Sequence, residues 1–227
     1  MVGPGHASII LADRLVDPTE RRWAVAHELG HYVLGHPAPP PETLFGPRPR
    51  RVSWDLPDDE DEADCFAFAV LTPERTVETF CDTRPMTLRP PLLLARACGV
   101  SLETGAIRVA ESTCRACAVV LSRREGIVWI APARQFLHTF GKALVPDQRL
   151  DPRSVAARYF GAAPVPDRPV VVPSAAWFVA APGEPPILEH SLPGTEPGTV
   201  LTMLWAPCWG VPRQRVPPHA RAVTYAP

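Results

Sequence analysis

The stretch WAVAHELGHYVLGHP, residues 23–37, places three of the chain's seven histidines within ten positions. His27 and His31 flank Glu28 in the pattern H-E-x-x-H. On a helix, residues four apart lie on the same face, so the two imidazoles can bind one metal ion. A glutamate beside them can deprotonate a water at the open coordination position. The alternative interpretation is a surface helix that carries two exposed histidines.

The residues around this stretch predict a helix with defined ends. Asp17 suits the N-cap and Pro18 the first helical position. We expect the helix to run to about Leu34 and to stop at Gly35, with Pro37 just beyond it. The H-E-x-x-H pattern therefore lies well inside a helix, as a metal site of this kind requires.

A second helix is predicted in DDEDEADCFAFAVLTP, residues 58–73, from its acidic first turn and closing proline. Glu60 begins this helix and would be the third protein ligand, with Glu62 as its leading substitute. Asp64, on the same face, would accept a hydrogen bond from the free N–H of a ligand histidine. Gly30, inside the first helix, would let another backbone come close to the site. Alternatively, the acidic residues only solvate the start of a helix.

The rest of the chain predicts short elements joined by stiff loops, because thirty prolines are dispersed among apolar runs. Strands are expected at residues 7–13, 51–54, 169–172, 187–191 and 200–205, a β-hairpin at 116–132, and helices at 91–97 and 102–111. A change at about residue 114 divides a helical half from a half richer in strands.

Composition limits the class of protein. The formal net charge of -1 gives no reason to expect binding to nucleic acid. The amino terminus lacks the features of a signal peptide, and no window reaches the roughly 18 apolar residues that span a bilayer. Six cysteines without a secretory signal do not indicate a disulfide scaffold. We therefore expect a cytoplasmic protein that does not contact a membrane.

Two motifs in order carry a resemblance to a known family. WAVAHELGHYVLGH, followed by EDEADCFAFAVLTP, resembles the ImmA/IrrE metallopeptidases. The family's second motif, E-x-x-A-N/D-x-F-A with a closing proline, matches this chain at Glu60, Ala63, Asp64, Phe66, Ala67 and Pro73. LARACGVSLETGAIRVAES, residues 94–112, is similar to the family's next helical segment. The similarity is close from about residue 7 to 112.

The resemblance implies an α+β protein with a gluzincin-like zinc site. His27, His31 and Glu60 would hold zinc, and Glu28 would be the catalytic base. Family members typically cut a helix-turn-helix repressor and so induce its genes, which makes such a repressor the expected protein partner. A zincin-like domain is expected at residues 1–113, with the helical segment 91–112 inside it. Residues 114–227 would form a smaller α/β domain, which the resemblance relates to a GAF sensor.

Other candidate ligands are less consistent with this pattern. His36 lies past a glycine and off the face that His27 and His31 share, so we do not expect it to bind the metal. Cys114 and Cys117 form a C-x-x-C pair without a second pair at zinc-finger spacing. They are expected to be half-buried side chains at the junction of the two domains.

Two other functions compete with proteolysis. A non-catalytic, metal-stabilised module could recognise a repressor or a small signal. The short segment before His27 favours it, because family members usually carry several dozen residues there, whereas the intact Glu28 argues against it. A DNA-binding regulator is disfavoured, since the helix predicted at 102–111 carries Arg108 as its one basic residue.

Overall fold

The computed structural model describes residues 17–37, 59–81, 85–140, 144, 147–178 and 185–207. The strands predicted at residues 7–13 and 51–54 lie outside these ranges. None of the helices in this described part combines the length and the apolar character that crossing a membrane would require.

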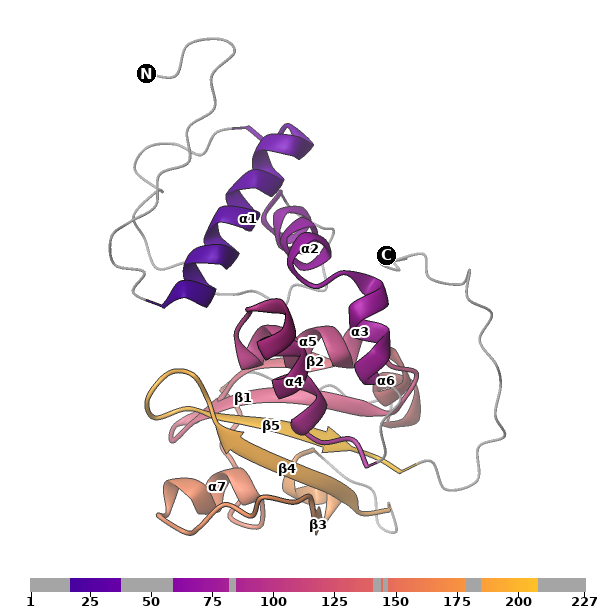
Figure 1. Ribbon diagram of the computed structural model, residues 1–227. Helices are drawn as coiled ribbons and strands as arrows, with labels where there is room; N and C mark the ends of the chain where they lie inside the picture. Colours follow the sequence, from indigo (N-terminus) through magenta and orange to yellow (C-terminus); the bar gives the residue numbers. More distant parts are fainter. Residues whose placement is uncertain are drawn as a thin grey trace.

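Helices and one sheet make up the described residues (Figure 1). The helices are α1 (Pro18–Leu34), α2 (Asp59–Leu71), α3 (Glu74–Cys81), α4 (Arg89–Cys98), α5 (Leu102–Ser112), α6 (Arg134–Phe140), α7 (Val155–Phe160) and a short 3-10 helix (Ser174–Ala176). The strands are β1 (Cys117–Arg123), β2 (Gly126–Pro132), β3 (Val170–Val172), β4 (Ile187–Pro193) and β5 (Val200–Trp205). The α+β class predicted from the sequence is confirmed.

The sheet is antiparallel throughout, in the order β2-β1-β5-β4-β3. Strand β1 lies inside the sheet, between β2 and β5. Val120 faces Ile130 of β2 on one side and Thr202 of β5 on the other. Six consecutive residues of β1 are buried, which explains why its sequence is a continuous apolar run rather than an alternating one.

The main hydrophobic core joins the sheet to helices α3, α4 and α5. It contains Val77 of α3, Leu94 of α4 and Val109 of α5, packed with the buried side chains of β1 and β5. In the described part of the chain, this cluster includes no residue of α1 or α2. Those two helices pack on each other above the rest of the molecule (Figure 1). The domain boundary at residues 113 and 114 falls between α5 and β1, and it stays a prediction.

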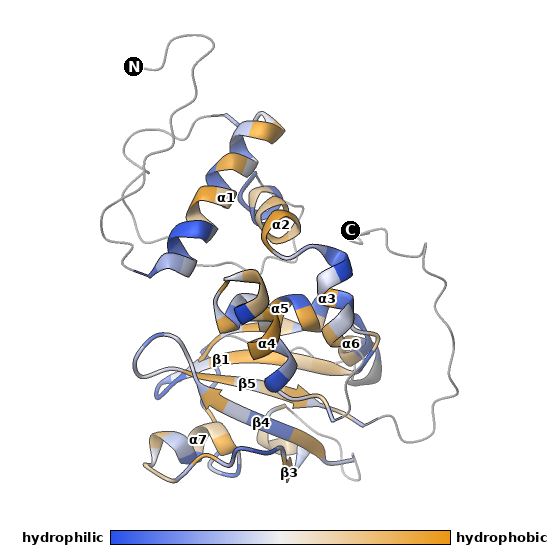
Figure 2. Cartoon of the chain, viewed as in Figure 1, coloured by the Kyte–Doolittle hydropathy of each residue, from blue (hydrophilic) through white to orange (hydrophobic). Residues whose placement is uncertain are grey.

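Polar side chains also join the helices to the sheet. Strand β4 carries a hydrophilic stretch in its middle, visible in Figure 2, where Glu189, His190 and Ser191 are all buried. The Leu88 N–H, just before α4, donates to Nδ1 of His190 at 2.9 Å. In α5, Oε1 of Glu103 accepts from the backbone N–H of Thr195 at 2.8 Å. Buried groups with such partners fix the position of α4 and α5 on the sheet.

Candidate metal centre

Helix α1, which carries the H-E-x-x-H pattern, begins and ends where the sequence predicts. Oδ1 of Asp17 accepts from the backbone N–H groups of Thr19 and Glu20, and Pro18 is the first helical residue. At the other end, Gly35 adopts the left-handed conformation with φ of 75°. Because both ends are fixed by local interactions, the turns between them hold the two histidines in register.

Helix α2 approaches α1 closely because small residues line the contact. Ala63 and Ala67 are fully buried against α1. A Cβ added to Gly30 would lie 3.0 Å from Cα of Ala63 and 3.1 Å from Cβ of Phe66. Glycine is therefore the residue that allows this approach, as the sequence predicts. The short distance brings the first turn of α2 beside the histidines of α1.

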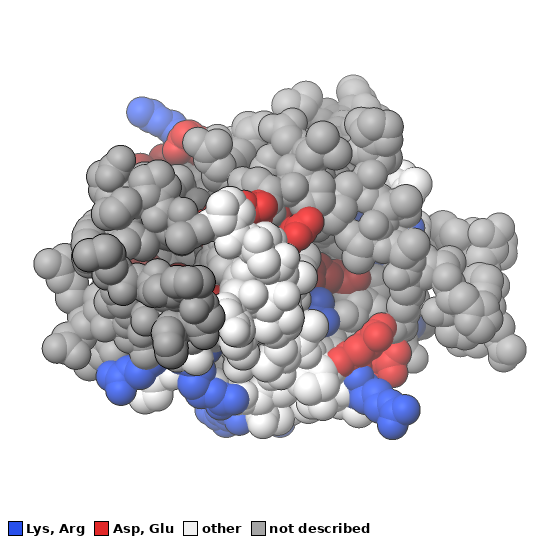
Figure 3. Space-filling view, turned by 90° about the horizontal axis from the view of Figure 1, so that it is seen from above, with Lys and Arg blue, Asp and Glu red and all other residues white. Residues whose placement is uncertain are grey.

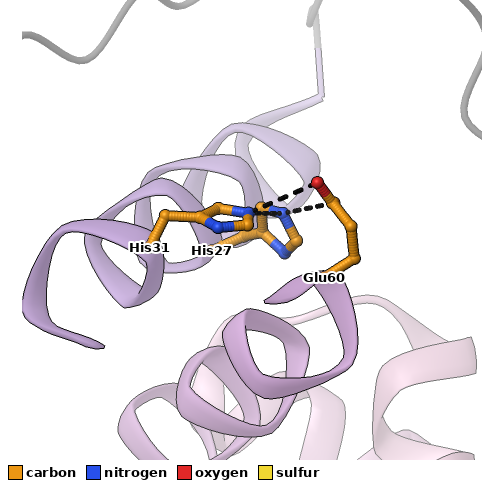
Figure 4. A group of neighbouring side chains, drawn as sticks. All are labelled: His27, His31 and Glu60. Carbon is orange, nitrogen blue, oxygen red and sulfur yellow. Dashed lines mark hydrogen bonds and ion pairs between the residues drawn. The ribbon is translucent and has the colours of Figure 1, made fainter. Parts of the chain in front are cut away.

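Three predicted ligands converge at this contact (Figure 4). Nε2 of His27 lies 3.0 Å from Nε2 of His31 and 3.2 Å from Oε2 of Glu60. Nε2 of His31 lies 3.6 Å from Oε1 of Glu60. A tetrahedral zinc ion with bonds of about 2.0–2.1 Å separates its ligand atoms by roughly 3.3 Å. The donor set and its spacing therefore fit such an ion.

The site is buried on one side and open on the other. The side chains of His27 and His31 are 13% and 18% exposed, and that of Glu60 is 47% exposed. Water can therefore reach the Glu60 side of the site. Such an arrangement is typical of a catalytic metal site, which keeps one position free, rather than of a closed structural site.

The two imidazoles differ in pKa because their neighbours differ. Burial lowers the pKa of His27, but the hydrogen bond and charge of Asp64 raise it. The charges of Glu60 and Glu28 act in the same direction, and the pKa of His27 is raised overall. Burial and the neighbouring His27 hold the pKa of His31 below its ordinary value, although Glu60 and Glu28 oppose them. A ligand nitrogen needs its lone pair, so a metal ion would bind His27 in its neutral form.

Asp64 lies behind His27, on the side away from the other ligands. Its Oδ1 is 2.9 Å from Nδ1 of His27, so it accepts a hydrogen bond from an Nδ1–H group. That hydrogen bond fixes the tautomer in which Nε2 carries the lone pair and faces the site. Glu28 follows His27 on the helix and is partly exposed; its charge acts on both rings, as described above.

The structure places Glu62, the substitute ligand, away from the three converging atoms. Its Oε2 lies 3.1 Å from Nε2 of His36, while Nδ1 of His36 lies 2.9 Å from Nδ1 of His31. Sequence reasoning gave His36 no role, because it considered only the face of a continuous helix. The turn at Gly35 brings the chain back, and the His36 N–H donates to the His31 carbonyl at 3.0 Å. The Leu-Gly-His sequence at the helix end was the available signal.

The prediction that both cysteines of the C-x-x-C pair are half-buried is wrong. Cys114 is exposed, whereas Cys117 is buried at the start of β1. Burial, together with the neighbouring thiols of Cys81 and Cys114, raises the pKa of Cys117 to about 12. A thiol that stays protonated near neutral pH is a poor nucleophile.

Glu20, Arg21 and Arg22 are exposed near the start of α1, whereas the side chains that it exposes from Val25 to Leu34 are apolar or aromatic. Seen from above, uncharged atoms form a ridge with acidic atoms at one of its ends (Figure 3). Large apolar side chains that α1 exposes are Val25, Leu29, Tyr32, Val33 and Leu34. Helix α1 therefore turns its histidines toward α2 and an apolar surface outward.

Comparison with known families agrees with this geometry. A family model described as the IrrE N-terminal-like domain, of peptidase family M78, matches residues 3–110. Residues 3–110 are therefore similar to the IrrE-like peptidases. No curated protein matches the chain. The resemblance to the ImmA/IrrE family is thereby confirmed.

The IrrE-like match covers both helices of the metal centre and ends inside α5, before the first strand of the sheet. Its extent agrees with the similarity expected from about residue 7 to 112. The five-stranded sheet lies outside the IrrE-like match. The match therefore supports a metallopeptidase-like domain around α1 and α2, and it carries no information on the sheet.

Proposed function

We propose that this chain is a zinc-dependent endopeptidase that cleaves a helix-turn-helix transcriptional repressor. The observation that carries the proposal is the convergence of two imidazole Nε2 atoms and one carboxylate beside Glu28. Similarity to the IrrE-like peptidases supports it. The repressor as substrate comes from the resemblance to ImmA/IrrE proteins. Cleavage would induce the genes that the repressor controls. Because such a repressor acts on DNA inside the cell, the proposed activity would be cytoplasmic.

Each residue of the centre has a role in this mechanism. His27, His31 and Glu60 hold the zinc ion, which, when bound, polarises the scissile carbonyl and makes a water molecule more acidic. Glu28 takes a proton from the attacking water and passes it to the leaving amine. Asp64 holds the N–H of His27 and so keeps the Nε2 lone pair directed at the site.

The same proposal extends to the two halves of the chain. The helical part would be a zincin-like domain, and the sheet a GAF-like sensor that controls it. The main hydrophobic core joins α3, α4 and α5 of the helical part to the sheet, so a sensor there would contact the helical part directly. The sensor role rests on the resemblance alone, since a fold does not fix a function.

Metal content tests the centre itself. Purified parent protein is expected to contain about one zinc ion per chain by elemental mass spectrometry. His31→Ala should lose the ion, whereas Glu28→Gln should keep it, because Glu28 is not a ligand. His138→Ala, at an exposed position on α6, is the matched histidine control. Absence of zinc from the parent, even after zinc is supplied, would favour the non-catalytic binding module instead.

Cleavage tests the role of Glu28. The parent and the Glu28→Gln protein are expressed separately in two cultures of the same cells. Newly formed protein N-termini in the two cultures are then compared by mass spectrometry. The parent is expected to produce new termini in a helix-turn-helix protein. Loss of a general base should slow cleavage by about 10²- to 10⁴-fold in the variant. Equal cleavage by both proteins would show that Glu28 is not the base.

A further inference from the structure

His36 lies immediately beyond the end of α1, between one candidate ligand and one carboxylate of α2. Its Nδ1 is 2.9 Å from Nδ1 of His31, and its Nε2 is 3.1 Å from Oε2 of Glu62. The rings of His31 and His36 are arranged edge to face, 5.0 Å apart. The His36 side chain is only 6% exposed, although it belongs to a helix terminus. A polar ring buried in this way is held by specific partners rather than by solvent.

The backbone explains how His36 reaches this place. Gly35 has φ of 75°, which reverses the chain after the last turn of α1. The His36 N–H then donates to the carbonyl of His31, and the two imidazole rings are in contact. This pairing of the helix terminus is the Schellman arrangement, in which the contact is usually between apolar residues. Here the contact joins two imidazoles.

The positions of the hydrogens in this series of contacts, from Glu62 through His36 to His31, follow from the carboxylate at one end. Glu62 is an acceptor, so Nε2 of His36 carries the hydrogen and donates it. A neutral His36 then has a lone pair on Nδ1, and it can only accept from an Nδ1–H of His31. His31 with its hydrogen on Nδ1 has its lone pair on Nε2. That is the atom that faces His27 and Glu60.

Both candidate histidine ligands are thus supported by carboxylates of α2. Asp64 holds His27 directly, whereas Glu62 holds His31 through His36. We propose that His36 is a positioning residue that fixes the tautomer and ring orientation of His31, and that Glu62 fixes His36 in turn. The inference deepens the metal centre of the proposed function and rests on it for its purpose, but the tautomer exists without metal.

The first test reads the tautomer in metal-free protein. Nitrogen-15 NMR of the labelled parent, under conditions where His31 is neutral, is expected to show the hydrogen of His31 on Nδ1. The same form is expected in His36→Asn, because the amide oxygen of asparagine can accept where Nδ1 of histidine does. His36→Ala and Glu62→Ala should shift His31 toward the Nε2–H form that free imidazoles favour. Finding Nε2–H in the parent, or no change in His36→Ala, would overturn the inference.

The second test is zinc affinity, measured by competition with a chelator. Loss of a group that orients a ligand typically lowers metal affinity by about 10- to 100-fold. We expect this loss in His36→Ala, a smaller loss in Glu62→Ala, and recovery in His36→Asn. Glu125→Ala removes the same charge at an exposed turn and should leave the affinity unchanged. Equal affinity of the parent and His36→Ala would refute the positioning role.

The two tests separate this inference from the proposed function. A parent that binds no zinc but carries its His31 hydrogen on Nδ1 would contradict the peptidase and support the role of His36. A parent that binds zinc tightly, with the same zinc affinity in His36→Ala, would support the proposed metal centre and contradict the role of His36. Circular dichroism of each variant checks that α1 is intact, and His36→Asn keeps a readable result if His36→Ala does not fold.

Discussion

Asp64 shows how one carboxylate can tune the candidate metal centre without binding the ion. Its Oδ1 accepts from Nδ1 of His27 at 2.9 Å. We expect Asp64→Ala to lower zinc affinity by about 10- to 100-fold, since His27 would lose the partner that orients it. Asp64→Asn keeps an acceptor oxygen and should lose less zinc affinity than Asp64→Ala. Isothermal titration with zinc measures both, and an Asp64→Ala protein as tight as the parent would contradict this role.

Among the single residues of the site, the sequence predicted the candidate ligands but missed the place of His36. Helical spacing alone brings His27 and His31 together, because positions four apart share a face whatever the tertiary structure. The partners on α2, Glu60 and Asp64, were predicted from the acidic start of a second helix, with Glu62 left open as a substitute for Glu60, and the resemblance then favoured Glu60. His36 could not be found in this way, since its position depends on a left-handed turn rather than on a helical face.

Between elements, the contact of α1 with α2 decides whether the ligands meet. Gly30→Ala would place a methyl group 3.0 Å from Cα of Ala63 and push the helices apart. Overpacking of this kind costs about 1–3 kcal/mol, and the better helix propensity of alanine offsets up to about 1 kcal/mol. We expect weaker zinc binding because Glu60 moves away from the histidines.

Chelator competition and urea unfolding measure the two effects of this substitution. A graded series supplies the control: Gly30→Val, with a larger side chain, should weaken zinc binding more than Gly30→Ala does. Affinity that is the same in parent, alanine and valine proteins would show that the approach of α2 does not govern the site.

Most elements in the described residues follow from local signals. The cap at Asp17, the apolar hairpin and the strands β3, β4 and β5 are confirmed by the structure. Helices α3, α6 and α7 were not predicted, because eight residues or fewer give too little periodicity. Pro73 was interpreted only as the end of α2, yet its carbonyl also accepts from Thr76 and Val77 and so begins α3.

On the scale of the whole molecule, the metal centre and the main core are separate. The cluster around the sheet contains no described residue of α1 or α2. Removal of zinc by a chelator should therefore speed hydrogen exchange of backbone amides in α1 and α2, and leave those of β1 and β5 nearly unchanged. Hydrogen exchange with mass spectrometry resolves the segments. Equal loss of protection in the sheet would show that the two parts unfold together.

The core of the sheet has its own pH dependence, through Glu189. This buried carboxylate accepts from Trp177 Nε1–H at 2.9 Å and from the Ala156 N–H at 2.8 Å. Burial raises its pKa despite these donors. Between the unfolded value of about 4.3 and the raised native value, the native state holds more protons, so stability falls as pH rises.

Glu189→Gln isolates that contribution. The substitution should remove the part of the pH dependence of stability that comes from this group. It should also lower the free energy of unfolding by about 1–3 kcal/mol, because the amide hydrogens of glutamine would face N–H donors. The stability difference between parent and variant is therefore expected to shrink as pH rises above about 4.3. Urea unfolding at a series of pH values measures it. A constant difference across that range would mean that Glu189 does not titrate in it.

The concentration of the centre in two neighbouring helices has an evolutionary consequence. Ligands and orienting groups come from α1, the turn after it and α2, while the sheet builds its core from other residues. Substitutions in distant, independent parts of a protein act nearly additively. Selection can therefore reshape the surface of the sheet, and with it whatever that half recognises, while the histidines keep their arrangement. Descendants of one ancestor can therefore differ in the sheet half while the candidate ligands keep their positions.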